Sequence, residues 1–140
     1  MPGLKNTLGA ELLKVHISYG PLAQELLKKF NRPGKALVVK GLAHITGGGF
    51  VDNIPRVLPE NCDVIIRKGT WPVLPIFKLL AEKGSVPEDE LYQVFNMGIG
   101  MTVFVPKEKA TEVLKTIQGH KLKAWTIGEV VRGKGEVQVQ

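Results

Sequence analysis

The sequence predicts a single α+β domain in which helices pack on a sheet. Apolar residues at helical spacing alternate irregularly with short β-branched stretches, so the order of elements is mixed rather than a strict strand–helix repeat. Residues 101–131 contain at least one strand–helix–strand unit. The 140 residues are enough to bury a hydrophobic core without disulfides or metals, and no internal repeat or low-complexity linker divides them.

The first helix that the pattern predicts spans residues 20–30. Pro21 is tolerated in its first turn, and NRPG after Phe30 ends it. Before this helix, the first 17 residues are the least decided part, because LGAELLKVHIS fits either a helix or a coil. The apolar face of the helix comprises Leu22, Leu26, Leu27 and Phe30.

The next segments predict strands on either side of a short helix. Residues 36–46 form a strand or a pair of strands that leads into three glycines. Residues 49–58 can make a short helix, which Pro55 bends by removing a backbone donor. The β-branched centre of residues 62–68 predicts another strand.

Two consecutive helices are predicted in the middle of the chain. The first lies within residues 71–84 and ends at Gly84, and the second is capped by Ser85 and runs to about Phe95. Pro87 and the acidic residues after it suit a first turn. The inward stripe expected on the first of these helices is Leu74, Phe77, Leu80 and Ala81.

The C-terminal third predicts a strand at residues 101–105, a helix at 106–119 and a closing hairpin. Its two strands are residues 124–131 and 136–140, and RGKG makes the turn. The residues of the helix expected to face inward are Ala110, Val113, Leu114 and Ile117.

Composition and charge exclude several classes of protein. No apolar run approaches the length of a membrane span, and the start of the chain has no secretion signal, so we expect a cytoplasmic protein without membrane contact. The single cysteine, Cys62, agrees with a reducing compartment. The net charge of +6 is spread among acidic residues, which argues against nucleic-acid binding and leaves a mild preference for an anionic small molecule open.

The triplet Gly47, Gly48 and Gly49 is the main candidate site. It follows a strand that ends in Thr46 and precedes a helix start, a geometry that presents backbone N–H groups to an anion such as phosphate. Absent Cβ atoms would let phosphate oxygens approach the backbone. A tight turn with close strand–helix packing explains the glycines equally well. The spacing matches neither the dinucleotide nor the Walker pattern.

Three neighbouring side chains extend this candidate. His44 has the strand parity of Thr46 and could face the same cleft, although a satisfied core histidine is the commoner case. Asn53 and Arg56 lie three residues apart, and Arg56 could clamp a phosphate or form an ordinary surface salt bridge.

A second glycine-spaced stretch is FNMGIGM at residues 95–101. Gly98 and Gly100 leave one strand face bare, so something lies against that face or the strand bends there. His16 and His120 are far apart in sequence and lack the spacing of a metal motif, and we expect no metal site and assign no catalytic residue.

Together, HITGGGFVDNIPRVLP at residues 44–59 and FNMGIGM at 95–101 closely resemble the C-terminal half of the phosphoribosylformylglycinamidine cyclo-ligases, also called aminoimidazole ribonucleotide synthetases. KGLAHIT, WPVLPIF and IGEVV extend the similarity from about residue 8 onward. KVHISYG at residues 14–20 departs from the PTRIY-type sequence common there, so no arginine role is transferred to that place.

The resemblance implies a fold, a reaction and partners. The fold is a three-layer α/β/α domain with a mixed sheet and partial ferredoxin-like topology. The reaction converts formylglycinamidine ribonucleotide and ATP to aminoimidazole ribonucleotide, ADP and phosphate, with magnesium, in a cleft between two domains of a homodimer. The residues that correspond to the family's cleft motifs are His44, Thr46, Gly47, Gly48, Gly49, Asn53, Arg56 and Asn96.

The resemblance also limits the expected activity. Residues 1–140 correspond to a single domain, the C-terminal half, and the N-terminal ATP-binding domain is expected to be absent, so this chain alone should bind no cofactor tightly and show no turnover. An alternative is a stand-alone module that binds a phosphorylated metabolite. A basic nucleic-acid domain is a third possibility, which the scattered charge and few aromatic residues disfavour.

Overall fold

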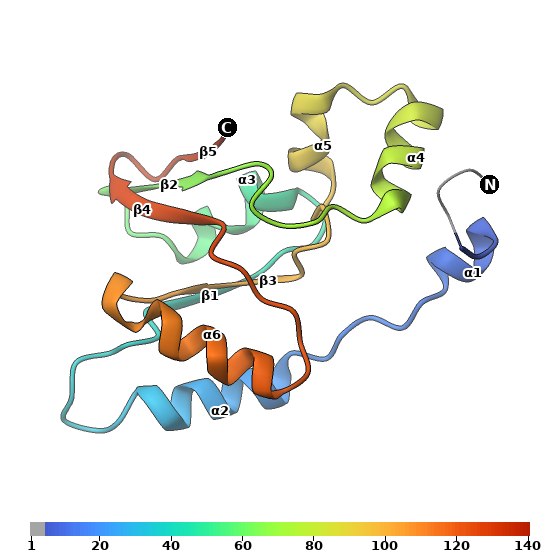
Figure 1. Cartoon of the computed structure of the whole chain (residues 1–140). Coiled ribbons are helices and arrows are strands. Elements are labelled where there is room, and N and C mark those ends of the chain that lie inside the picture. The colour runs from blue at the N-terminus through green and yellow to red at the C-terminus, as the bar shows by residue number, and fades with distance from the viewer. Residues whose placement is uncertain (1–4) are drawn as a thin grey trace.

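A computed structural model describes residues 5–140. They form six α-helices and five strands, and two of the strands make a small central sheet (Figure 1). Residues 1–4, which begin the segment predicted as either helix or coil, lie outside the described residues. The α+β class predicted from the sequence is confirmed. No helix within residues 5–140 combines the length and apolarity needed to cross a bilayer.

The central sheet pairs β1 (Gly41–His44) with β3 (Met101–Phe104) in antiparallel register. Leu42 lies opposite Val103, and Ala43 lies opposite Thr102. Because successive side chains on a strand point to opposite faces, these two pairs belong to different faces of the sheet. Each face therefore carries its own hydrophobic core.

One face of this sheet is covered by α2 (Gly20–Phe30) and α6 (Ala110–Gly119), which lie side by side in Figure 1. Both helices occur where the apolar periodicity predicts them. Leu27 was expected to face inward but is 40% exposed, because the buried stripe follows Leu22, Leu26 and Phe30. On α6, Thr116 is buried; its hydroxyl donates to Glu112 O and accepts from Lys29 Nζ.

The other face packs against α3 (Gly49–Asn53), α5 (Glu88–Val94) and a second sheet. Phe50 is fully buried and packs against the rings of Trp71 and Tyr92, which also contact each other. The predicted bend at Pro55 is confirmed, since α3 stops at Asn53 and a 3₁₀ turn follows at Pro55–Val57. This second core surrounds the turn that contains the glycine triplet.

The second sheet has the order β4-β2-β5, and it contradicts the predicted hairpin. β4 (Gly128–Arg132) pairs antiparallel and β5 (Val137–Val139) pairs parallel with β2 (Cys62–Ile66), which lies between them. The chain therefore crosses the start of β2 instead of turning back on itself.

The Asp63 carboxylate holds this crossing. It accepts hydrogen bonds from the N–H groups of Glu136 and Lys134, at 2.8 and 2.7 Å. These bonds hold the pKa of Asp63 below its usual value. Gly133 has no space for a side chain, because a Cβ there would overlap the same carboxylate.

The helices α4 (Pro75–Gly84) and α5 form a hairpin at the edge of the molecule. The inward stripe predicted for α4 is partly wrong. Ile76 is its buried residue, and Leu74 is 51% exposed. Ser85 does not cap α5; it has a left-handed φ of 50° and ends α4, and Pro87 occupies the N-cap position of α5.

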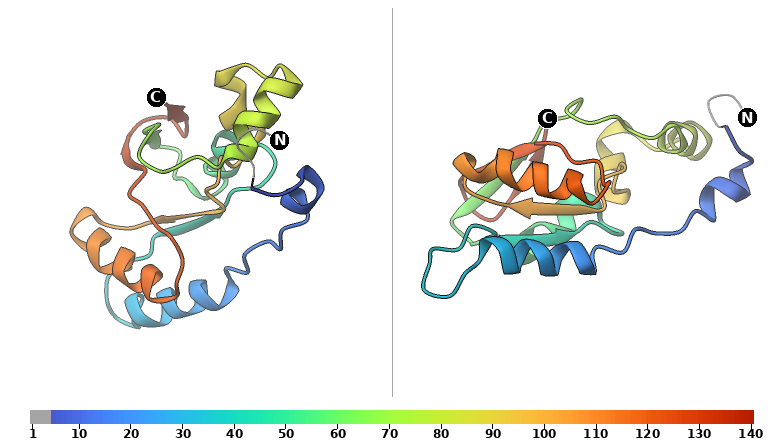
Figure 2. Two further views of the ribbon diagram at one scale, coloured as in Figure 1. Left: turned by 45° about the vertical axis from the view of Figure 1, so that its right-hand side comes forward. Right: turned by 60° about the horizontal axis from the view of Figure 1, so that its bottom comes forward.

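The N-terminal segment extends away from the body of the domain, as both views in Figure 2 show. It consists of α1 (Leu8–Leu12), capped by the Thr7 hydroxyl, and an extended stretch, residues 13–19, that we call the N-terminal arm. Leu13 and Val15 on the arm are 84% and 95% exposed. The domain itself therefore leaves apolar side chains of this arm uncovered.

The strands form two sheets, and the three-stranded sheet is mixed. The central sheet lies between two groups of elements. The helix pair α2 and α6 covers one face, and α3 with the sheet that contains β2 covers the other. The finer prediction, a three-layer α/β/α arrangement with partial ferredoxin-like topology, stays a prediction.

Candidate functional site

The glycine loop, residues 46–49, connects β1 to α3, and its three glycines have different surroundings. A Cβ on Gly49 would lie 2.0 Å from the carbonyl oxygen of Tyr92, and its φ is +54°. Gly48 is the N-cap of α3 with a φ of +90°. Gly47 has neither constraint, since no atom of another residue in the described range 5–140, its two chain neighbours aside, lies within 4 Å of a Cβ built there. Tight packing thus explains two glycines, and the third borders open space.

The buried side chain of Asn53 holds this loop in shape by hydrogen bonds. Its side chain is buried, and its Nδ2 donates to the carbonyl oxygens of Gly47 and Gly49 at 3.1 and 2.8 Å. The Thr46 hydroxyl donates to Asn53 Oδ1 at 3.3 Å. Buried amides with satisfied hydrogen bonds rigidify the backbone that they contact. Two of the predicted site residues, Thr46 and Asn53, therefore position the loop.

The backbone N–H groups of the loop also differ in whether they have a hydrogen-bond acceptor. The N–H of Gly49 donates to Thr46 O at 3.1 Å. Within residues 5–140, the N–H groups of Gly47 and Gly48 have no hydrogen-bond acceptor. The carboxylate of Asp52 lies directly beside Gly48, so one side of the loop carries negative charge. An anion would approach from the side of Gly47.

The second predicted motif lies against the first one. The carbonyl oxygen of Phe95 would lie 2.9 Å from a Cβ on Gly49, so the two motifs are neighbours in the fold. Asn96 Oδ1 accepts from the N–H of Gly98 at 3.0 Å, which builds a tight turn. The indole N–H of Trp71 donates to Met97 O in this turn. Asn96 is half-buried at the edge of the glycine loop.

The bare strand face predicted at Gly98 and Gly100 is occupied by another part of the chain. A Cβ on Gly100 would lie 2.2 Å from the Tyr19 hydroxyl. Burial raises the pKa of Tyr19 above its usual value. Tyr19 thus anchors the inner end of the N-terminal arm against β3.

His44 is exposed and does not lie in a core. Its Nε2 is 3.3 Å from Nε2 of His16 on the N-terminal arm, and the ring of Tyr19 lies edge-on to both. The sequence analysis missed this pair, because 28 residues separate the two histidines and no local spacing signals their contact. His120 lies elsewhere, 2.7 Å from a carboxylate oxygen of Glu25.

Arg56 lies in the 3₁₀ turn after α3, and its side chain is exposed. It forms no ion pair and no side-chain hydrogen bond within residues 5–140. The surface salt bridge that competed with a binding role is therefore not formed in the described part of the chain. The exposed guanidinium is therefore available to an anion, and the turn that carries it packs beside Gly41 at the start of β1.

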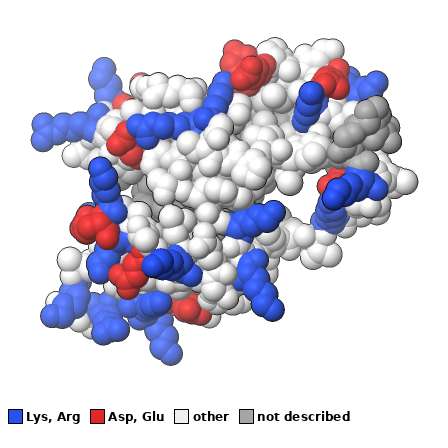
Figure 3. Space-filling model, in the orientation of Figure 1, with Lys and Arg blue, Asp and Glu red and all other residues white. Residues whose placement is uncertain are grey.

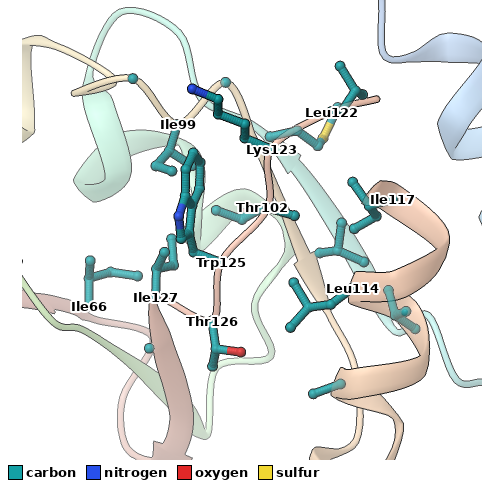
Figure 4. Close-up of a pocket in the computed structure, with 18 of the residues that line it drawn as sticks. Ile66, Ile99, Thr102, Leu114, Ile117, Leu122, Lys123, Trp125, Thr126 and Ile127 are labelled. Carbon is teal, nitrogen blue, oxygen red and sulfur yellow. The ribbon is translucent and has the colours of Figure 1, made fainter. Parts of the chain in front are cut away.

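A separate cavity of about 1020 Å³ lies between the two sheets and α6. Figure 4 shows Trp125 and Ile66 on one side of it and Leu114 and Ile117 of α6 on the other. None of the predicted site residues lines this cavity. Its lining comes mostly from residues 98–105 and 121–130, and it is largely apolar. The sequence analysis placed residues 98–101 in the second glycine motif and residues 101–105 and 124–131 in strands, and it did not predict the cavity.

The charges and potential metal ligands show no strong local concentration. Lys and Arg side chains on the face shown in Figure 3 are spread around its margin with acidic residues among them. In the described range, no group of three or more His, Cys, Asp or Glu side chains is placed to hold a metal ion.

Comparison with known families decides the relationship. The family model described as "AIR synthase related protein, C-terminal domain" matches residues 16–140. The chain belongs to this family. Both glycine motifs and the whole α+β core fall within the matched range.

Two similar curated relatives share one name. The phosphoribosylformylglycinamidine cyclo-ligase of Geobacillus thermodenitrificans is 46% identical over 91% of this chain and 35% of its own length. The relative of the same name from Acetivibrio thermocellus is 45% identical over 97% of this chain and 38% of its own length. The chain therefore spans little more than a third of the curated relatives that it matches.

Among solved structures, HypE of E. coli, a hydrogenase maturation protein, is similar to this AIR synthase-related domain. It superposes with a TM-score of 0.63 and 27% identity over 93% of this chain and 39% of its own. A chain from a HypE–HypF complex gives the same TM-score at 20% identity, which supports the fold alone.

Proposed function

We propose that this chain forms the C-terminal wall of the substrate cleft in a phosphoribosylformylglycinamidine cyclo-ligase. The reaction converts formylglycinamidine ribonucleotide and ATP to aminoimidazole ribonucleotide, ADP and phosphate. The name carried by the curated relatives supports this activity. The three-layer α/β/α arrangement with partial ferredoxin-like topology is part of the same proposal.

One observation carries the proposal: within residues 5–140, two backbone N–H groups of the glycine loop have no acceptor and lie next to open space. The N–H groups of Gly47 and Gly48 provide the donors, and the absence of any atom near Gly47 provides the room. Charge-assisted hydrogen bonds from such groups contribute roughly 1.5–3 kcal/mol each. We assign this loop to the phosphate group of the ribonucleotide.

The other predicted residues have distinct roles in this proposal. Arg56 pairs with the phosphate, because its guanidinium is exposed and unpaired within residues 5–140. Thr46 and Asn53 hold the loop in its shape. His44 and Asn96 border the loop from β1 and from the second motif.

ATP and magnesium belong to another domain in this proposal. The Asp52 carboxylate lies beside the loop, and within residues 5–140 no group of three or more His, Cys, Asp or Glu side chains could hold magnesium in its usual oxygen-rich site. We therefore assign both ligands to the N-terminal domain, and no step is derived through them. The assembled protein is a cytoplasmic homodimer in this proposal, as the family resemblance implies.

The test is reconstitution of the two domains. The chain is mixed with the N-terminal domain of the Geobacillus thermodenitrificans relative, ATP, magnesium and formylglycinamidine ribonucleotide, and aminoimidazole ribonucleotide is measured. We expect product from the mixture and none from either part alone. Formation of a stable complex that yields no product would contradict the proposal.

A second candidate is a stand-alone module that binds a phosphorylated metabolite. The open loop and the exposed Arg56 favour it as well. Isothermal titration of the chain alone with ribose 5-phosphate separates the two candidates. A free-standing module should bind at micromolar concentration or tighter, whereas one wall of a cleft should bind much more weakly.

A further inference from the structure

Two exposed histidines from distant parts of the chain face each other at the base of the N-terminal arm. His16 lies on the arm, and His44 is the last residue of β1. Their Nε2 atoms are 3.3 Å apart, and their ring centres are 5.2 Å apart. Because both side chains are exposed, a solute ion can reach the nitrogens.

The two Nε2 atoms can share a hydrogen bond whose direction depends on the tautomers, but it is long and bent. N–H hydrogen bonds in proteins usually have heavy-atom distances of about 2.7–3.2 Å and nearly straight angles. A straight bond at the observed nitrogen separation would put the ring centres about 5.5 Å apart, since each centre lies about 1.1 Å behind its nitrogen. The observed ring separation is shorter, so the two rings meet at an angle.

A tetrahedral metal ion accounts for both distances. Zinc–imidazole bonds are about 2.05 Å long, and a tetrahedral angle between two of them puts the nitrogens about 3.3 Å apart and the ring centres about 5.1 Å apart. The pair shows 3.3 and 5.2 Å. The two imidazoles therefore already have the separation that such an ion requires.

Tyr19 keeps His16 in this position. The hydroxyl end of Tyr19 packs against Gly100, and its ring makes edge-on contacts with both imidazoles, with centres 5.9 and 6.0 Å away. Because His16 lies only three residues before this anchored tyrosine, its position is restricted. The pair is thus held by packing, although the rest of the arm is exposed.

We propose that His16 and His44 bind a divalent transition-metal ion of the zinc type. Imidazole nitrogens suit Zn²⁺, Ni²⁺ and Cu²⁺, and water completes the four-coordinate shell because two protein ligands are present. The ion links the N-terminal arm to β1. The metal site shares His44 with the border of the glycine loop, but its proposal does not rest on phosphate binding there.

Cobalt absorption and zinc calorimetry test the site on the 140-residue chain without a histidine tag. Cys62→Ser serves as the parent protein, because it removes the half-exposed thiol as a competing ligand. We expect one equivalent of Zn²⁺ to bind, and Co²⁺ to give the visible bands of tetrahedral coordination. His16→Gln and His44→Gln should each weaken zinc binding at least tenfold.

The chain offers its own control, since it has three histidines. His120→Gln should change zinc affinity less than twofold, because His120 pairs with Glu25 away from the site. His16→Cys should retain zinc binding and add a thiolate-to-cobalt band in the near ultraviolet. Equal zinc affinity in the parent protein and His16→Gln, or no zinc binding by the parent protein, would overturn the proposal.

Discussion

The glycine loop and the N-terminal arm differ in what determines their shape. Every residue of the loop is fixed by the domain's own contacts, from the Tyr92 carbonyl beside Gly49 to the buried amide of Asn53. The arm touches the domain through Tyr19 and through the His16–His44 contact, and beyond them Leu13 and Val15 are 84% and 95% exposed. The loop is therefore preorganised within this chain, whereas the arm has an apolar surface that the described domain does not cover.

Exposed apolar surface of this kind usually marks a contact with another protein surface. The chain spans little more than a third of its curated relatives, and the family match begins within the arm, at residue 16. We therefore propose that the rigid loop binds the ligand and that the arm docks on another domain. The following predictions test that division.

The largest effect is expected for Gly49→Ala. The new Cβ would lie 2.0 Å from the Tyr92 carbonyl oxygen, at a φ of +54°. Backbone displacement of this kind should lower the free energy of unfolding by about 2–4 kcal/mol. Urea denaturation measures the change.

Gly47→Ala is the matched control for this substitution. It has open space and no positive φ, so it should change stability by less than about 1 kcal/mol. Equal losses for the two variants would mean that the loop is not held as described.

A smaller loss is expected for Asn53→Ala. It leaves the carbonyl oxygens of Gly47 and Gly49 without their buried donor, which should cost about 1–3 kcal/mol. Asn61→Ala, at an exposed position, should have little effect. An unchanged midpoint in urea for Asn53→Ala would show that the loop does not depend on this amide.

The crossing at Asp63 gives a pH-dependent prediction. Backbone N–H groups of Glu136 and Lys134 lower the pKa of Asp63 in the folded state, so the charged carboxylate stabilises the fold. This stabilisation is present above the ordinary carboxyl pKa of about 3.9 and is lost as the pH falls through the lower folded-state pKa.

Thermal unfolding of Asp63→Asn tests the sign of this dependence. Between pH 5 and pH 2, a range that contains the ordinary carboxyl pKa, the stability of the wild type should fall with pH. The stability of the variant should change less over the same range. A wild-type curve that is as flat as that of the variant would contradict the assigned hydrogen bonds.

The smallest effect on stability is expected for Leu13→Ser and Val15→Ser. Both side chains are exposed, so each change should alter the unfolding free energy by less than about 0.5 kcal/mol. The same variants should weaken association with the N-terminal domain in the reconstitution assay. A loss above about 1 kcal/mol in the isolated chain would show that the arm packs on the domain.

Local patterns predicted the elements well where packing follows periodicity. The helix at residues 20–30 and the strand after Gly100 occur where their apolar spacing places them. The closing hairpin was wrong, because two strands joined by RGKG look the same whether or not β2 lies between them. That information comes from residues 62–66, which are far away in sequence.

The candidate site was predictable to a similar degree. The glycine triplet could be identified, but the different reasons for Gly47 and Gly49 depend on the Tyr92 carbonyl, which only the fold brings close. The His16–His44 pair has no sequence signal, because an extended arm can place His16 almost anywhere. Long-range contacts thus set the limit in both cases.

The central claim, phosphate binding by the glycine loop, is tested most directly by amide NMR. The ¹⁵N-labelled chain is titrated with ribose 5-phosphate, and the amide signals of Gly47 and Gly48 are followed, with Arg56→Ala as the comparison. We predict that these two amides shift most, and that the shifts shrink in the variant. Unmoved Gly47 and Gly48 signals at millimolar ligand would contradict the assignment.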